Sequence, residues 1–297
     1  MKVSDDQLAA WTRPAFGNEE KLAADTEAAI RRAINNHPVL APMNIRILPK
    51  GSFKNNTNVR RDSDIDVAIV NQGLISLHFH SGATFAHSGL SPYTGISTSD
   101  FKAAVGQAMR SEFGNGNVDG SGNKVFRLRG SDRIINADII PSSRYWYMSP
   151  THHVEGIELI LDRPDGNRHF NYPDQHLDNG VAKNNRTGRR YKRTVRIIKN
   201  LENRLVADGI IGEFPSFLIE CLAYNVPDGV YSDNKTWRQI VMDALVYMWG
   251  YANNTAEPAD HLRWLEVSHQ KYLFGSHQRW SKKDVTNFVE TAFEVVT

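Results

Sequence analysis

Residues 51–70 read GSFKNNTNVRRDSDIDVAIV, and the alternation at the end of this stretch sets the architecture that we expect. Asp64 and Asp66 alternate with Ile65 and Val67. Successive side chains of a β-strand point to opposite faces, so the two carboxylates share one face and the two apolar side chains share the other. The stretch therefore predicts a strand with one buried face and one acidic face.

The acidic face has the ligands that a divalent cation prefers. Mg²⁺ is usually held by one or two carboxylates together with substrate phosphates, and a second ion about 4 Å away assists phosphoryl displacement. Gly51 and Ser52 precede the strand, and such a pair at a helix start leaves backbone N–H groups for a phosphate. The alternative is a polar surface turn with solvated aspartates. The two features together favour a metal and phosphate site.

A further carboxylate occurs in residues 133–141, RIINADIIP. Asp138 shares a strand face with Asn136 and Ile140 and lies on an otherwise apolar strand. An unpaired carboxylate is costly to bury, so either a metal or a lysine is needed to explain it. A strand-end salt bridge is the simpler alternative.

These motifs resemble the nucleotidyltransferases of the DNA polymerase β superfamily. The resemblance rests on Gly51-Ser52, on a polar stretch containing a threonine, and on Ser63-Asp64-x-Asp66 entering a strand. Within the superfamily the chain looks most like the group that includes the oligoadenylate synthetases and the bacterial cGAS/DncV-like enzymes of CBASS anti-phage systems. The resemblance implies an α+β fold, with a polymerase β-like core of mixed or antiparallel sheet and helices, followed by a C-terminal helical domain.

The resemblance also implies roles for the acidic residues. Asp64, Asp66 and Asp138 become a catalytic triad that holds two Mg²⁺ ions, with Mn²⁺ as an alternative metal. Asp138 would help to activate the attacking ribose hydroxyl, either as the base or as its electrostatic equivalent.

Residues 189–206, RRYKRTVRIIKNLENRLV, have apolar residues at helical spacing. Lys192, Arg196 and Lys199 fall on the flank of this stripe, from which basic side chains reach into a cleft; a solvated helix face is the alternative. In the resembling family a lysine on this helix contacts the triphosphate and a serine opens the next helix. Lys199 and Ser216 match these positions, although Ser216 is also suited to be only an N-cap.

Composition narrows the class of protein. The chain has 297 residues, 23% of them charged, and a net charge of +2, which excludes a disordered tail or a broadly basic nucleic-acid coat. Cys221 is the single cysteine, so no internal disulfide forms. An apolar run long enough to cross a bilayer is missing, which predicts a soluble cytoplasmic protein without a membrane partner. We expect a nucleotidyltransferase core with an N-terminal helix in residues 1–165 and a helical nucleotide-binding domain in residues 166–297.

The other segments give coarser expectations. The histidines His78, His80 and His87 invite a zinc site, but their spacing fits no tetrahedral signature. Tyr145 and Tyr191 are candidates for contacts with a base. The expected elements are one or two helices in 4–37 with Ser4 as N-cap, a short strand or helix end at 45–48, a loop or lid at 73–98, a helix after Ser99 as N-cap, a hairpin of 124–129 with 133–141, a strand at 157–162 and an extended connection at 163–185.

The function implied by the resemblance is synthesis of a cyclic di- or trinucleotide second messenger from nucleoside triphosphates in anti-phage signalling, with a separate effector protein that binds the product. Activation by DNA is not expected, because the zinc-binding insertion of the animal DNA sensor is absent and the basic stripe is short. Two rival hypotheses are a transferase that modifies tRNA or a small molecule, and a catalytically inactive scaffold that binds nucleotides.

Overall fold

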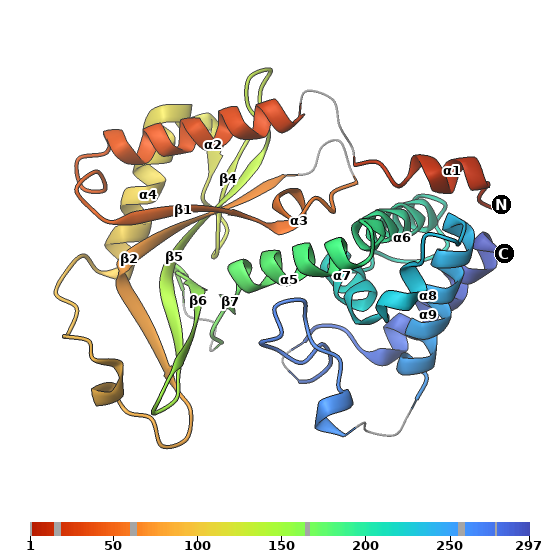
Figure 1. Ribbon diagram of the computed structural model, residues 1–297. Helices are drawn as coiled ribbons and strands as arrows, with labels where there is room; N and C mark the ends of the chain where they lie inside the picture. The colour runs from red at the N-terminus through yellow and green to blue at the C-terminus, as the bar shows by residue number, and fades with distance from the viewer. Residues whose placement is uncertain (1, 15–18, 60–63, 164–166, 255–258, 277) are drawn as a thin grey trace. The chain divides into compact units, whose positions relative to one another are not determined.

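The computed structural model describes the chain except for residues 1, 15–18, 60–63, 164–166, 255–258 and 277 (Figure 1). Its contacts divide the chain into two compact units. The sheet unit consists of Phe16–Lys54 and Arg61–Pro173, and the helical unit consists of Met1–Ala15, Asn55–Arg60 and Asp174–Thr297. The sequence-based division into 1–165 and 166–297 differs from this, since two short N-terminal pieces belong with the C-terminal helices.

The sheet unit is built on a seven-stranded sheet in the order β1-β2-β5-β4-β3, counted over the described residues, with β6 paired to β5 and β7 to β6. Strands β2 and β5 are parallel, and the other pairs are antiparallel. The expected mixed sheet is thereby confirmed. The strands are β1 (Ile45–Lys50), β2 (Ile65–Phe79), β3 (Val118–Asp119), β4 (Phe126–Leu128), β5 (Ala137–Met148), β6 (His153–Leu159) and β7 (Phe170–Asn171).

One face of this sheet is covered by two helices in contact with each other, α2 (Glu19–Asn36) and α4 (Thr98–Phe113), which cross in the view of Figure 1. Val67 and Ile139 point to these helices and are fully buried. On the opposite face a smaller apolar cluster includes Ala68 and Ile140. The predicted alternation of both strands is therefore confirmed. Short helices complete the unit: α3 (Gly51–Lys54), η1 (Phe85–Ser88) and η2 (Asn115–Asn117).

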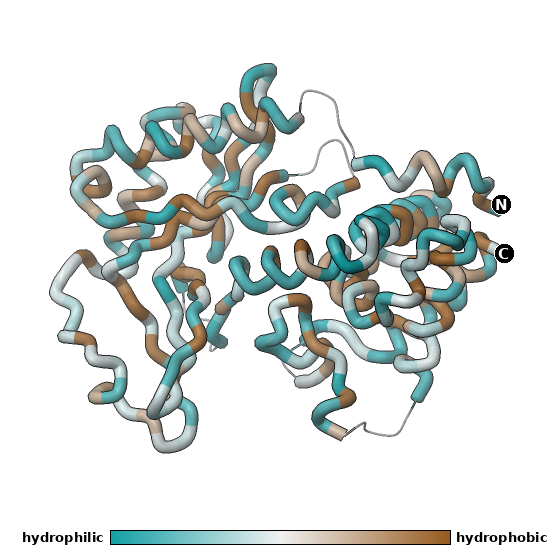
Figure 2. Tube along the Cα trace, viewed as in Figure 1, coloured by the Kyte–Doolittle hydropathy of each residue, from teal (hydrophilic) through white to brown (hydrophobic). Residues whose placement is uncertain are grey.

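The helical unit packs its helices around one apolar core, in which Tyr191, Leu218 and Leu245 are fully buried. Figure 2 shows hydrophobic residues along α7 and α8, whereas α6 carries hydrophilic residues among hydrophobic ones. The helices are α1 (Asp5–Ala10), α5 (Pro173–Arg186), α6 (Arg190–Ala207), α7 (Ser216–Asn225), η3 (Asp228–Tyr231), α8 (Trp237–Ala252), η4 (Asp260–Leu262) and α9 (Lys282–Val296). In the described part of the chain, no helix is both long and apolar enough to cross a bilayer.

Several local predictions are confirmed. The described part of residues 4–37 contains two helices, α1 and α2, and the Ser4 side chain accepts the expected N-cap hydrogen bond from the Gln7 amide. Residues 45–48 lie in strand β1, the helix expected next to Ser99 is α4, and β4 pairs with β5 as the predicted hairpin. The strand expected at 157–162 is β6, which begins and ends earlier.

Other local predictions are wrong. The loop expected from residue 73 is strand up to Phe79, because β2 resumes its pairing with β5 at Ile75 after an irregularity that hides the alternation. The N-cap of α4 is Ser97 rather than Ser99. The extended connection expected at 163–185 contains α5.

Helix α5 was missed because few of its residues are apolar; polar contacts hold it instead. Asn179 donates to the Val267 carbonyl at 2.9 Å, and Lys183 donates to the Val226 carbonyl at 2.8 Å. The α6 cations expected to flank a cleft are buried as well: Arg196 donates to the backbone carbonyls of Thr12 and Asn56.

Candidate active site

Five charged residues form one row across the strands β1-β2-β5-β4-β3 of the sheet unit, and it ends with Asp119 of β3, the register partner of Arg127. Asp66 and Asp138 are register partners on the parallel strands β2 and β5. Lys50 is the partner of Asp66 on β1, and Arg127 is the partner of Asp138 on β4. Cross-strand partners lie on the same face of a sheet, so two adjacent carboxylates have a cation on each outer side. The Lys50 Nζ lies 3.9 Å from Asp66 Oδ1.

The two carboxylates resist ionisation. Burial raises the pKa of Asp66 above its ordinary value, and the charge of Asp64 adds to this against the opposing effect of Lys50. Burial also raises the pKa of Asp138, with contributions from Asp66 and Asp64 and opposition from Arg127 and Lys50. Asp138 thus senses the negative charge of Asp66 and Asp64, and Asp66 senses that of Asp64. A divalent cation beside them would offset that repulsion.

Gly51 meets the row from the end of β1. Its φ of 74° is in the left-handed region, which favours glycine. A Cβ at this position would lie 2.0 Å from Asp66 Oδ2, so no other residue leaves room for the carboxylate. Ser52 follows at the start of α3 and is partly buried. Gly51 is therefore placed directly against Asp66, one of the predicted carboxylates.

Asp64 is exposed and immediately precedes β2, and Ser63 lies outside the described residues. Over the residues that the structure describes, no group of three or more His, Cys, Asp or Glu side chains is arranged to hold a metal ion. The structure thus brings Asp66 and Asp138 together but does not gather Asp64 with them into a three-ligand set. The paired carboxylate oxygens nevertheless fit Mg²⁺ or Mn²⁺ by donor chemistry.

In the helical unit Lys199 belongs to a buried network around Glu220 of α7. The Lys199 Nζ lies 3.7 Å from Glu220 Oε2 and donates to Thr57 Oγ1 at 3.3 Å. Thr57 Oγ1 donates to Glu220 Oε2 at 2.8 Å, and His176 Nε2 lies 2.9 Å from Glu220 Oε1. The network joins α5, α6 and α7 to the segment Asn55–Arg60 of the same unit.

The network sets the charge of its two central groups. Burial alone would raise the pKa of Glu220, but the hydrogen bond and charge of His176, the charge of Lys199 and the Thr57 hydroxyl bring it to about 2. Burial lowers the pKa of Lys199, against the attraction of Glu220. The Lys199 side chain is only 3% exposed, so it is not a solvated helix face.

The remaining predicted site residues lie in different surroundings. Ser216 is exposed and is the first residue of α7. The N-cap is Pro215, which rules out the alternative that Ser216 is only an N-cap. Tyr145 and Tyr191 are fully buried, and the Tyr145 ring stacks on Phe170 at 4.5 Å. Both rings are core residues as the structure stands, which contradicts a contact with a base.

The three histidines considered for zinc interact with other residues of the sheet unit. His78 Nδ1 lies 2.9 Å from the Tyr145 hydroxyl, and the His80 ring meets the edge of Tyr147. His87 Nδ1 accepts from the Thr84 amide at 3.0 Å. Each ring therefore has a structural role.

Sequence reasoning missed the two cations of the row and the centre of the buried network. Lys50 and Arg127 are recognised only from strand register, which the sequence does not specify. Glu220 had a signal, since it is the one charged residue in the apolar stretch FLIECLAY and a buried carboxylate needs partners.

A mixed sheet with neighbouring carboxylates on two parallel strands, joined to a separate helical unit, is the architecture of a nucleotidyltransferase. Comparisons with known proteins specify the family. The chain is 31% identical over 291 residues to the cyclic dipyrimidine nucleotide synthase CdnE of Cecembia lonarensis, covering 97% of this chain and 96% of that protein. It is 33% identical over 293 residues to the enzyme of the same name from Legionella pneumophila, covering 96% and 95%. A family model of the cGAS/DncV-like nucleotidyltransferase C-terminal helical domain matches residues 178–297. The chain belongs to the bacterial cGAS/DncV-like nucleotidyltransferases.

Solved structures agree with this assignment. The Rhodothermus marinus CdnE c-UMP-AMP synthase, with Apcpp and Upnpp, superposes with a TM-score of 0.83 at 25% identity and covers 99% of this chain and 96% of its own. The Elizabethkingia meningoseptica CdnE cyclic dinucleotide synthase, with GTP and Apcpp, has a TM-score of 0.80 at 28% identity and covers 99% and 98%. The predicted fold class and the predicted enzyme class, a nucleotidyltransferase, are confirmed.

Proposed function

We propose that this enzyme joins nucleoside triphosphates into a cyclic di- or trinucleotide that acts as a second messenger in CBASS anti-phage signalling. Support comes from relatives named as cyclic nucleotide synthases, whose whole length the chain nearly covers. The observation that carries the chemistry is the register pairing of Asp66 with Asp138, which puts two carboxylates side by side.

The reaction is a displacement at the α-phosphorus of one triphosphate. A ribose hydroxyl oxygen of the acceptor nucleotide forms the new P–O bond, the bond from the α-phosphorus to its bridging oxygen breaks, and pyrophosphate leaves. Asp138 accepts the hydroxyl proton or stabilises the oxygen as it loses it. Asp66 and Asp138 would hold two Mg²⁺ or Mn²⁺ ions together with Asp64, whose exposed carboxylate must first turn toward them. When bound, the ions neutralise phosphate charge and favour ionisation of the hydroxyl.

The other predicted residues would bind the triphosphate. Backbone N–H groups at Gly51 and Ser52 are suited to phosphate oxygens, as is the exposed hydroxyl of Ser216. The Lys199 ammonium interacts with Glu220 and Thr57 in this structure. It can contact a phosphate only if phosphate oxygens replace these two partners. The product is expected to act on a separate effector protein, and activity is expected without DNA.

The test is incubation of the purified chain with each radiolabelled ribonucleoside triphosphate, alone and in mixtures, with Mg²⁺ or Mn²⁺. We expect phosphatase-resistant products whose masses, measured by mass spectrometry, match cyclic di- or trinucleotides. Asp66→Asn and Asp138→Asn should abolish them. Asp132→Asn, which changes an exposed carboxylate of the same unit outside the row, is the matched control and should retain activity.

Two outcomes would contradict the proposal. Label transferred only after addition of tRNA or a small-molecule acceptor would favour the macromolecule- or drug-modifying transferase. If no nucleotide combination gives product, and Asp66→Asn leaves phage protection intact, the protein is an inactive scaffold.

A further inference from the structure

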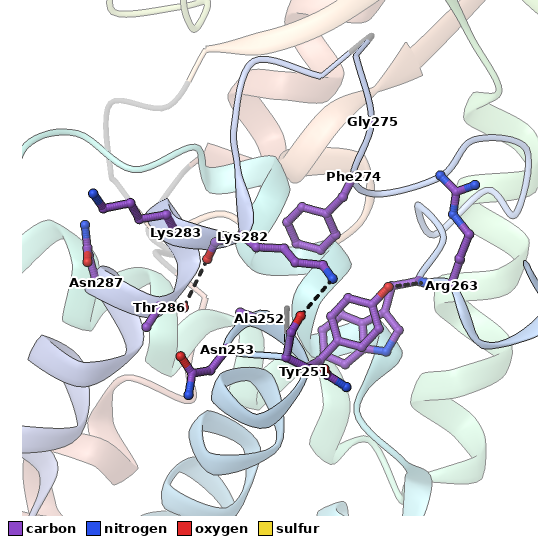
Figure 3. Close-up of a pocket in the computed structure, with 12 residues that line it drawn as sticks. Tyr251, Ala252, Asn253, Arg263, Phe274, Gly275, Lys282, Lys283, Thr286 and Asn287 are labelled. Carbon is purple, nitrogen blue, oxygen red and sulfur yellow. Dashed lines mark hydrogen bonds between the residues drawn. The ribbon is translucent and has the colours of Figure 1, made fainter. Parts of the chain in front are cut away.

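The helical unit contains a cavity of about 590 Å³ that the reaction above does not use. It lies between the end of α8, the segment that carries Arg263 and Phe274, and the start of α9 (Figure 3). None of the proposed catalytic or phosphate-binding residues lines it. Its volume is within the range of cavities that bind small ligands.

The charge of the lining is one-sided. Arg263, Lys282 and Lys283 contribute cations, and no Asp or Glu is among the described lining residues. Arg263 has a partner in Asp260, 3.5 Å away and largely exposed. In the described part of the chain, Lys282 donates to the Asn254 carbonyl at 3.2 Å, and neither lysine makes an ion pair. The lining therefore favours an anion.

The two lysines occupy the first two positions of α9, a helix of 15 residues. A helix N-terminus carries a partial positive charge, so cations at this end are unfavourable and an anion is favourable. Asp284 at the third position offsets part of this charge, since its carboxylate accepts from the Ser281 amide in the capping box. A phosphate beside the lysines would offset the remainder.

Aromatic rings form another part of the wall. Tyr251 stacks on Trp264 with centroids 4.1 Å apart, and Phe274 lies 5.9 Å from Tyr251 on the same wall. In Figure 3 the Lys282 side chain extends toward Tyr251, and its Nζ lies 5.1 Å from the centroid of that ring. Rings beside cations suit a ligand with a planar group and a negative charge.

Amide side chains complete the lining: Asn253 and Asn287 are exposed and offer both donors and acceptors of the kind that read the edge of a base. We propose that this cavity is a second ligand site, which binds a nucleoside phosphate, with the base on the aromatic wall and the phosphate beside Lys282. The Lys283 side chain points away from Tyr251 in Figure 3 and adds positive charge at the same end of α9. The proposal is independent of the catalytic reaction.

The experiment uses the full chain carrying Asp66→Asn and Asp138→Asn, with EDTA, so that metal-dependent nucleotide binding is removed. AMP, GMP, CMP and UMP are titrated by calorimetry and compared with inorganic phosphate and adenosine. We expect one saturable event for at least one nucleotide, with weaker binding of phosphate or adenosine alone. Lys282→Glu with Lys283→Glu should weaken it by about tenfold or more, the size expected for loss of charge-assisted hydrogen bonds.

Arg193→Glu is the matched control, because it makes the same kind of charge change at an exposed position of the same unit outside the cavity. Phe274→Leu should weaken the nucleotide more than inorganic phosphate. The milder Lys282→Gln, checked by thermal melting, separates loss of binding from loss of folding. Absence of nucleotide binding at millimolar concentration, or equal weakening by Arg193→Glu and by the lysine variants, would overturn the proposal.

Discussion

At the scale of the residue, the site depends on close approach between one backbone and one carboxylate. Gly51 is held at a left-handed φ of 74° with its Cα against Asp66, so the glycine is required twice, for conformation and for space. Gly89 has a similar φ of 64°, but a Cβ there would meet nothing within 4 Å. A substitution at Gly89 would therefore add backbone strain alone, whereas one at Gly51 would add both strain and a collision with Asp66.

Gly51→Ala is expected to abolish nucleotidyl transfer, because the new methyl group displaces the Asp66 carboxylate. It should also lower the free energy of unfolding by at least 1–2 kcal/mol, roughly the left-handed cost for a residue with a Cβ. Gly89→Ala should show a similar stability loss and keep its activity. Turnover measured beside thermal melts checks both; wild-type turnover in Gly51→Ala would show that Asp66 tolerates the displacement.

At the scale of the element, some strands and helices could be predicted from the sequence and others could not, for identifiable physical reasons. The strand containing Asp66 was recognised because Ile65 and Val67 alternate with Asp64 and Asp66. Ile65, Val67 and Ile69 fill the core under α2 and α4. Its continuation to Phe79 was hidden by the irregularity between Asn71 and Ile75. Strand register was equally hidden, and with it the contributions of Lys50 and Arg127.

Polar contacts between helices are equally hard to predict from the sequence. The buried charge of Glu220 links α7 to His176 of α5 and to Lys199 of α6, contacts between residues 21 to 44 positions apart that periodicity does not reveal. Lys199 was noticed on its helix, but its burial was not. The periodicity of a helix is enough to single out a residue such as Lys199. Its partner cannot be identified in this way, because it depends on how the helices pack.

Glu220→Gln is expected to destabilise the protein, since it leaves Lys199 buried without its counter-charge; losing one partner of a buried ion pair costs about 3–5 kcal/mol, and an isosteric amide somewhat less. The folded pKa of Glu220, about 2, is below the ordinary value of 4.5. Its stabilisation is therefore complete above pH 4.5 and disappears as the pH falls toward 2.

Chemical denaturation between pH 7 and pH 2 measures this dependence. The wild-type unfolding free energy should fall more steeply on acidification than that of Glu220→Gln, which has no carboxyl to titrate. Glu213→Gln, an exposed position of the same unit, should follow the wild type. Parallel pH curves for wild type and Glu220→Gln would mean that the network contributes no net stability.

At the scale of the whole molecule, the helical unit is assembled from three pieces of chain. Leu8 of α1 is fully buried in its core, and the Val3 amide donates to the Val295 carbonyl at 2.9 Å. Arg196 donates to the carbonyls of Thr12 and Asn56. The N-terminal residues therefore complete the C-terminal unit, which a division of the chain at a single point does not provide.

A fragment of residues 166–297 is consequently expected to be unstable by itself, since it lacks the apolar cover of Leu8 and leaves the buried Arg196 guanidinium without its carbonyl partners. Hydrogen exchange should find α6 and α9 far less protected in the fragment than in the full chain. Adding residues 1–14 through a flexible linker should restore part of the protection, whereas the same linker with Leu8→Asp should not. A fragment with the melting temperature and exchange pattern of the full chain would mean that α1 and the Asn55–Arg60 segment only rest on a unit that folds without them.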